Sequence, residues 1–326
     1  MLFQFSIGDF FSSLSYGYLQ RSLIATILVG VACGIIGTLV ILKGLSFLGD
    51  GMAHASFAGG ALSILAALNP FLTIFGFAIA AAMFVGVINE RRGSVRQDAP
   101  VGVMFAFAMA LAVLFVGLMT RYSVDISSLL FGSALTISIE NYWYLVIFSV
   151  VVLALFFLFK KELLFITFDE EMASVSGISV KFFNFLFLMM MAAIVTVSVQ
   201  AIGILLVVAM IVVPATAAYQ WTYNFNKMIF LSAIFGGFSS FVGLVISFTF
   251  NLPSGATIVL TVIAIFLISF VASPKRRMSL FTSQHDQQRH VEECRYCVVA
   301  EEAQECAYCA DEKTEEEHGT TDEEEK

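Results

Sequence analysis

The feature that most constrains this chain is a series of apolar stretches separated by short polar turns. An α-helix of about 20 residues spans the hydrocarbon core of a bilayer, and roughly nine stretches of that length follow one another along the chain. Charged residues make up only 13% of the sequence and the mean hydropathy is +0.90. A soluble domain is about one quarter charged. The sequence therefore predicts an all-α polytopic membrane protein with about eight or nine transmembrane helices.

Three segments follow from the placement of polar residues. Residues 1–20 mix aromatic and polar side chains and are expected to form an interfacial helix. Residues 21–277 are predicted to be the transmembrane domain, and residues 278–326 a small soluble tail. No basic stretch precedes a short apolar run with a cleavage site, so we expect no removable signal peptide.

The predicted spans alternate across the membrane with a clear charge bias. Nearly all of the lysines and arginines before the tail, 11 of 13, fall on one side, and only Arg21 and Arg121 fall on the other. Cytoplasmic loops are enriched in these residues, so that side is predicted to be cytoplasmic, with the tail. The expected spans are residues 22–42, 45–68, 71–88, 101–119, 142–159, 182–199, 204–219, 228–250 and 256–271.

The net charge of −8 belongs to the tail rather than to the membrane domain. From Asp286 onward there are 15 acidic and four basic residues, which gives −11, so the remaining residues carry +3. A basic patch of the kind that binds nucleic acid is not evident. We expect a multi-pass protein of the cell (inner or plasma) membrane with an acidic cytoplasmic tail.

Two ionisable residues lie inside the second predicted span. Asp50 and His54 are four residues apart in a stretch of small and apolar residues, so a helix places both on one face. Counting from Lys43 at the cytoplasmic surface, they lie roughly 10 and 16 Å deep. Ionisable groups at such depth are normally functional or paired. Metal ligation, a proton relay and a purely structural Asp–His pair all remain open, and manganese, iron or zinc would suit the donors.

Two further segments have patterns typical of moving or docking parts. Residues 125–132 are too short for a span, and Asp125, Phe131 and Gly132 are candidate gate residues of a re-entrant helix capped by Asp125. The predicted cytoplasmic loop 160–181 contains a short helix that begins with acidic residues and ends at a glycine. Such a helix can dock in a cleft of a partner, and its candidate residues are Glu170, Glu171, Met172, Ala173 and Gly177.

Five stretches together resemble the metal-uptake permeases of ABC transporters, which import zinc, manganese or iron. The loop around Glu171 is similar to the first half of the coupling motif of ABC importer permeases, although the Leu-Pro that continues that motif is absent. The resemblance covers about residues 20–273 and rests on residues 45–60, 96–102, 125–132, 168–177 and 200–216.

This resemblance implies a type II ABC importer permease architecture. It implies a homodimeric pore, two ATPase subunits on the cytoplasmic side and an extracytoplasmic metal-binding protein. It also implies that Asp50 and His54 coordinate the transported metal. The sequence of residues 53–56, Ala-His-Ala-Ser, is slightly more similar to that of the zinc-importing members of this family. No Walker A motif is found, so ATP hydrolysis is expected on a separate chain and this chain is expected not to be an enzyme.

The tail carries a cysteine pattern that the resemblance does not cover. Two C-x-x-C pairs are separated by eight residues, a spacing that offers four thiolates to one tetrahedral zinc ion. A redox pair or incidental cysteines are the alternatives. We expect a structural or regulatory zinc there, at Cys294, Cys297, Cys306 and Cys309.

Three other functions compete with metal import by an ABC permease. A permease for a metal chelate, such as a siderophore or cobalamin, would share the architecture but need a wide pore without a ligand pair. A secondary, proton-coupled metal transporter would favour inverted repeats and more intramembrane carboxylates, neither of which is evident. A membrane-bound metal sensor would depend on the cysteine tail.

Overall fold

The structure, a computed structural model, describes residues 17–91, 98–119 and 137–273. These residues form helices and connecting turns, and no strand occurs among them. The helices are α2 (Gly17–Leu42), α3 (Leu48–Ala66), α4 (Pro70–Arg91), α5 (Asp98–Gly117), α7 (Ile139–Leu158), α8 (Lys160–Phe168), α9 (Glu170–Val175), α10 (Val180–Ile202), α11 (Ile204–Tyr219), α12 (Phe225–Phe250) and α13 (Ser254–Ala272).

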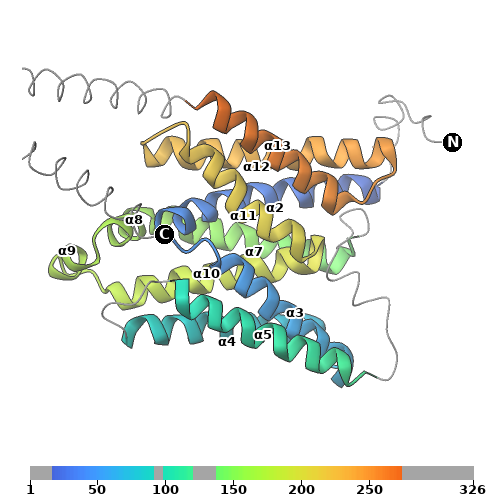
Figure 1. Ribbon diagram of the computed structural model, residues 1–326, viewed down its shortest axis with the longest axis horizontal. Helices are drawn as coiled ribbons and strands as arrows, with labels where there is room; N and C mark the ends of the chain where they lie inside the picture. The colour runs from blue at the N-terminus through green and yellow to red at the C-terminus, as the bar shows by residue number, and fades with distance from the viewer. Residues whose placement is uncertain (1–16, 92–97, 120–136, 274–326) are drawn as a thin grey trace, which may run out of the picture. The chain divides into compact units, whose positions relative to one another are not determined.

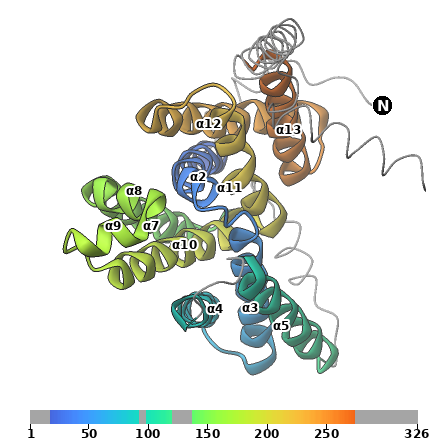
Figure 2. The same cartoon turned by 60° about the vertical axis from the view of Figure 1, so that its left-hand side comes forward.

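The chain divides into a unit that ends at Ala272 and a second unit, Ser273–Lys326. Within the first unit the long helices run side by side (Figure 1). Helices α3, α4 and α5 form one group, and α2, α11, α12 and α13 form another, as Figure 2 also shows. Helix α10 packs against α3, α4, α7 and α11, so it connects the two groups. The expected all-helical membrane fold is confirmed.

Seven of the described helices are long and apolar enough to cross a membrane. The two other predicted spans are helices as well, but they differ from the seven. Helix α11 is shorter, at 16 residues, and α3 has 19 residues but a lower hydropathy. Polar and small residues lower the hydropathy of α3, and these are the residues that make it the candidate site helix.

Some predicted helix boundaries are wrong. Helix α2 begins at Gly17, five residues before the expected start of the first span at residue 22. The Arg21 Nε donates a hydrogen bond to the Gly17 carbonyl at 3.0 Å, which accommodates the charge inside the helix. Residues 1–16 lie outside the described residues. The turn expected over residues 200–203 is shorter, because α10 continues to Ile202 and Gly203 alone breaks the helix, with φ +88°.

Close helix packing depends on small residues at facing positions. Gly30 of α2 faces Gly236 of α12, and a Cβ at either position would meet the backbone of the other. One turn further, the Ser232 hydroxyl donates a hydrogen bond to the Gly34 carbonyl at 2.7 Å. Small residues allow membrane helices to approach this closely, and interhelical hydrogen bonds add to the association.

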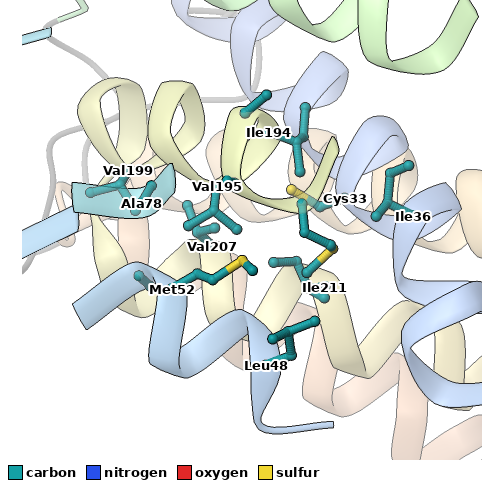
Figure 3. Packing of buried hydrophobic residues seen from close by; sticks show 14 of the residues in the cluster. Cys33, Ile36, Leu48, Met52, Ala78, Ile194, Val195, Val199, Val207 and Ile211 are labelled. Carbon is teal, nitrogen blue, oxygen red and sulfur yellow. The ribbon is translucent and has the colours of Figure 1, made fainter. Parts of the chain in front are cut away.

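The buried core lies where α2, α3, α10 and α11 meet. Figure 3 shows Met52 of α3 beside Val207 and Ile211 of α11, with Val195 and Val199 of α10 nearby. Met52, Val195 and Val207 have no solvent-exposed surface. Helix α3 is therefore held on several sides, by α4, α5, α10 and α11.

Candidate metal site

The chain enters α3 through a fixed turn at the end of α2. Gly44 adopts φ +70°, a conformation that favours glycine. Its N–H donates to the Ile41 carbonyl at 3.1 Å. The Leu45 N–H donates to the Val40 carbonyl at 3.0 Å, which completes a Schellman motif. Leu45 is buried, so the turn is anchored in the core immediately before α3 begins at Leu48.

Asp50 and His54 lie in the first two turns of α3. The His54 Nε2 is 3.4 Å from the Asp50 Oδ1, and both side chains are partly exposed, at 18% for His54 and 32% for Asp50. Two ligands bound about 2.1 Å from one ion and separated by a tetrahedral angle lie about 3.4 Å apart. The separation of these two atoms therefore suits ligation of the same metal ion without rearrangement of α3.

Neighbouring helices shape the surroundings of this pair. The Phe105 ring of α5 contacts the His54 imidazole edge to face, with ring centroids 4.9 Å apart. Gly51 lies against the Met104 side chain of α5, and Gly49 lies against Ile211 of α11. The glycines flanking Asp50 thus let two helices approach the site helix from different sides, and an aromatic ring limits the rotation of His54.

The described residues supply only part of a metal coordination sphere. No group of three or more His, Cys, Asp and Glu side chains that could hold a metal occurs in the described residues. The His54 Nδ1 is buried and has no hydrogen-bond partner in that part of the chain. A metal-ligating histidine almost always donates its second ring nitrogen to a carboxylate, carbonyl or water. The site therefore needs further metal-ligating atoms, and an acceptor for the His54 Nδ1, beyond the groups that the described residues bring together.

Helix α9 has well-defined ends. The Asp169 Oδ1 accepts a hydrogen bond from the Met172 N–H at 2.9 Å and caps the start of the helix. At the other end Gly177 has φ +83°, and the Ile178 N–H donates to the Ala173 carbonyl at 3.1 Å. Because both ends are capped, α9 is a well-defined helix although it has only six residues, and we call Glu170–Val175 the knob.

Exposed apolar side chains flank the acidic residues at the start of the knob. Phe168 is 71% exposed, Met172 58% and Val175 85%, whereas Ala173 faces inward and is fully buried. Glu170 and Glu171 are exposed. Exposed apolar residues gathered in this way mark an interaction surface. Of the predicted docking residues, Ala173 holds the knob in place and Met172 lies on its surface.

Several predicted site residues lie outside the described residues. These are the gate candidates Asp125, Phe131 and Gly132 and the tail cysteines Cys294, Cys297, Cys306 and Cys309. The stretch 96–102, which carries part of the family resemblance, is described only from Asp98 onward.

The sequence pattern did not indicate two features of the site. Phe105 contacts His54, but one phenylalanine among 34 gives no signal. Lys43 and Asn184 are hydrogen-bonded to each other at 2.7 Å although they are 141 positions apart in the chain. Asn184 is a polar residue in an otherwise apolar run, and this is the one local sign that it has a partner.

A model of the ABC 3 transport family matches residues 15–273. The chain belongs to this family. It is similar to the manganese transport system membrane protein MntC of Listeria monocytogenes, with 38% identity over 274 residues, which cover 84% of this chain and 96% of the relative. It is also similar to a probable iron transport system membrane protein of Haemophilus influenzae, with 34% identity over 80% of this chain and 92% of the relative.

A solved structure of a related protein agrees with the fold of this ABC 3 family member. The structure of PsaBC from Streptococcus pneumoniae in complex with a Fab matches with a TM-score of 0.74 and 33% sequence identity. The match covers 83% of this chain and 98% of that chain. The helical permease architecture predicted from the sequence is therefore shared with this relative, and the family is a transport family.

Proposed function

We propose that this chain is the membrane permease subunit of an ATP-binding-cassette importer for a divalent transition metal ion. The observation that carries the proposal is the Asp50–His54 pair, whose donor atoms lie 3.4 Å apart on α3, a span predicted from the sequence, in a protein of the ABC 3 family. A carboxylate and an imidazole are donors that divalent transition metals accept. The partial exposure of both side chains leaves room for an ion to enter and leave.

Manganese is the first candidate cargo. The relative from Listeria monocytogenes carries manganese transport in its name, and the relative from Haemophilus influenzae carries iron transport. A site of carboxylate and imidazole donors suits both metals, and affinity order alone does not determine selectivity among them. The slight similarity of residues 53–56 to zinc importers makes zinc the comparison ion in any assay.

The functional unit in this proposal is a homodimer. One chain offers two donors, whereas about four or more surround a bound transition metal. A second copy related by a two-fold axis near α3 would add its own aspartate and histidine. This arrangement would also bring further polar groups toward the unpartnered His54 Nδ1. The dimer would thus complete a site that one chain leaves open.

Energy would come from partner chains. The sequence contains no Walker A motif, and α9 is a capped knob with exposed Met172 and Val175. In the proposed dimer, the knob of each chain would dock on one of two ATPase subunits at the cytoplasmic surface. A metal-binding protein on the opposite side would deliver the ion, and movement of α9 would alternate access to the Asp50–His54 site.

Two sequence features extend the proposal beyond the described residues. Residues 125–132 would form the gate, with Asp125, Phe131 and Gly132. The four tail cysteines would bind a zinc ion in the cytoplasm, where disulfides are rare. Native mass spectrometry of the full chain tests the tail. A bound zinc that is lost on replacing Cys294 and Cys297 with serine supports it, and a tail without metal contradicts it.

The central experiment is metal uptake by the complete transporter in liposomes, with manganese, iron and zinc compared at equal concentrations. Asp50→Ala and His54→Ala are each expected to reduce uptake to background, because each removes one of the two donors that a chain supplies. Glu140→Gln is the matched control, because it removes a carboxylate that is exposed in the first turn of α7, away from α3.

Each variant is also checked for dimer assembly by size-exclusion chromatography with light scattering. Loss of uptake with an intact dimer supports a role in metal ligation. Uptake at the wild-type rate in both alanine variants would overturn the site assignment. Failure of the wild-type complex to move any of the three metals would overturn the proposed function itself.

A further inference from the structure

A largely enclosed lysine connects three elements at the end of the helix bundle where α9 lies. Lys43 follows the last residue of α2, and its ammonium donates a hydrogen bond to the Asn184 Oδ1 of α10 at 2.7 Å. The Asn184 Nδ2 donates in turn to the Glu170 Oε1 of α9 at 3.0 Å. Lys43 Nζ and Glu170 Oε1 are 4.0 Å apart. In Figure 1, α9 and the first turns of α10 lie at this same end.

Lys43 is unusually enclosed for a lysine. Its side chain is only 9% exposed, and its ammonium lies 5.5 Å from the centre of the Phe187 ring of α10. Burial lowers the pKa of Lys43, and the Glu170 carboxylate opposes that shift. Lysine is almost never buried unless it is paired. Glu170 is therefore the acidic partner that favours the charged form of Lys43.

Both ends of this connection are attached to rigid structure. On one side, Lys43 begins the Schellman turn that holds Gly44 and Leu45 and leads directly into α3, where Asp50 lies seven residues later. On the other side, Glu170 is the first residue of the capped helix α9. The Glu170 side chain is 49% exposed, so a partner that docks on α9 can reach its carboxylate.

We infer that Lys43, Asn184 and Glu170 form a polar relay that transmits displacement of α9 to the turn before α3. All three are positioning residues in this inference, which rests on the proposed function of the chain. If α9 moves, or if the docked partner forms its own ion pair with the Glu170 carboxylate, the enclosed Lys43 ammonium loses its counter-charge. The turn that carries Lys43 must then shift, because an uncompensated buried charge is strongly unfavourable. The position of that turn determines the position of the first turn of α3, which contains Asp50.

The test measures the number of metal ions imported per ATP hydrolysed by the complete transporter in liposomes. Lys43→Met keeps the apolar stem of the side chain and removes its charge. It is expected to lower the ratio of uptake to hydrolysis by about fivefold or more, while the rate of ATP hydrolysis stays within about twofold of wild type. Lys227→Met is the matched control, because Lys227 is exposed at the start of α12, and it is expected to leave the ratio unchanged.

A second variant isolates the charge at the other end of the relay. Glu170→Gln keeps an oxygen that accepts the Asn184 hydrogen bond but removes the counter-charge of Lys43, so an intermediate ratio is expected. The double variant with Lys43→Met is expected to be no worse than Lys43→Met alone, because residues of one network are not additive. If Lys43→Met does not fold, Glu170→Gln alone still tests the relay.

The possible results separate the relay from a structural role and from the proposed function. A wild-type ratio in Lys43→Met, or in Glu170→Gln if that is the only variant obtained, overturns the relay. A loss of uptake and hydrolysis in equal proportion also overturns it, because that result indicates damage to the fold. Absence of metal uptake by the wild-type complex indicates failure of the proposed function instead.

Discussion

Gly59 of α3 determines how closely the site helix approaches α4. A Cβ built at Gly59 would lie 2.7 Å from the Thr73 carbonyl oxygen and 2.9 Å from the Ile74 Cα, whereas ordinary contact begins at 3.4 Å. Both are backbone atoms, which cannot turn aside as a side chain can. An alanine at position 59 therefore requires α3 and α4 to move about 0.7 Å apart at this point. That movement brings the distance between its Cβ and the Thr73 oxygen from 2.7 Å to an ordinary 3.4 Å.

Gly76→Ala is the matched control for this change. Gly76 lies on α4, the same helix that Gly59 contacts, and a Cβ there would meet nothing within 4 Å. Replacing glycine by alanine within a helix gains about 1 kcal/mol of intrinsic helix stability at either position. This gain cancels in the comparison of the two variants. The difference in unfolding free energy then isolates the overpacking cost at Gly59, about 1–3 kcal/mol.

Thermal unfolding in detergent, followed by circular dichroism at 222 nm, measures this difference. A cost of about 2 kcal/mol in a domain of this size lowers the midpoint of Gly59→Ala by roughly 4–8 °C relative to Gly76→Ala. His54 lies five residues from Gly59, about 7.5 Å along the helix axis, so metal uptake is expected to fall as well. An unfolding midpoint of Gly59→Ala equal to or above that of Gly76→Ala would refute the packing argument.

Two further substitutions test single hydrogen bonds. Asp169→Ala removes the cap on the Met172 N–H and is expected to destabilise α9 by about 0.5–2 kcal/mol, seen as faster hydrogen exchange in that helix. Asp169→Asn retains the acceptor oxygen and should exchange more slowly than Asp169→Ala; equal rates would contradict the cap. Ser232→Ala removes the bond to the Gly34 carbonyl and is expected to lower unfolding stability by about 0.5–1.5 kcal/mol, and an unchanged unfolding midpoint would argue against this bond.

The sequence was sufficient for the features that depend on local spacing. A span is a run of apolar residues of a given length, so each of the nine predicted spans corresponds to a helix. Asp50 and His54 are neighbours because they are four residues apart on one helix, and the structure places their donor atoms 3.4 Å apart. Such pairs are encoded within a single turn and need no knowledge of the tertiary fold.

Features that depend on distant residues were not predictable. Lys43 was interpreted as a charge at the end of the first span, and nothing near it in the sequence indicates Asn184 or Glu170 as partners. A local contact was missed as well: α2 begins at Gly17, five residues before the predicted start of the first span, and the Arg21 side chain bonds the Gly17 carbonyl within the helix. In both cases a charged side chain has a hydrogen-bond partner, and a prediction based on runs of apolar residues takes no account of such partners.

The low hydropathy of α3 comes from the polar and small residues of the candidate site. Asp50 and His54 each disfavour insertion of a helix into hydrocarbon, and the glycines beside them contribute no apolar side chain. Packing offsets this cost, because α4, α5, α10 and α11 surround α3 and bury Met52 and Ala53 completely. The same small residues that make α3 a weak membrane span on its own allow those helices to approach it. A polar site can therefore lie in this span because neighbouring helices, rather than lipid, cover most of its surface.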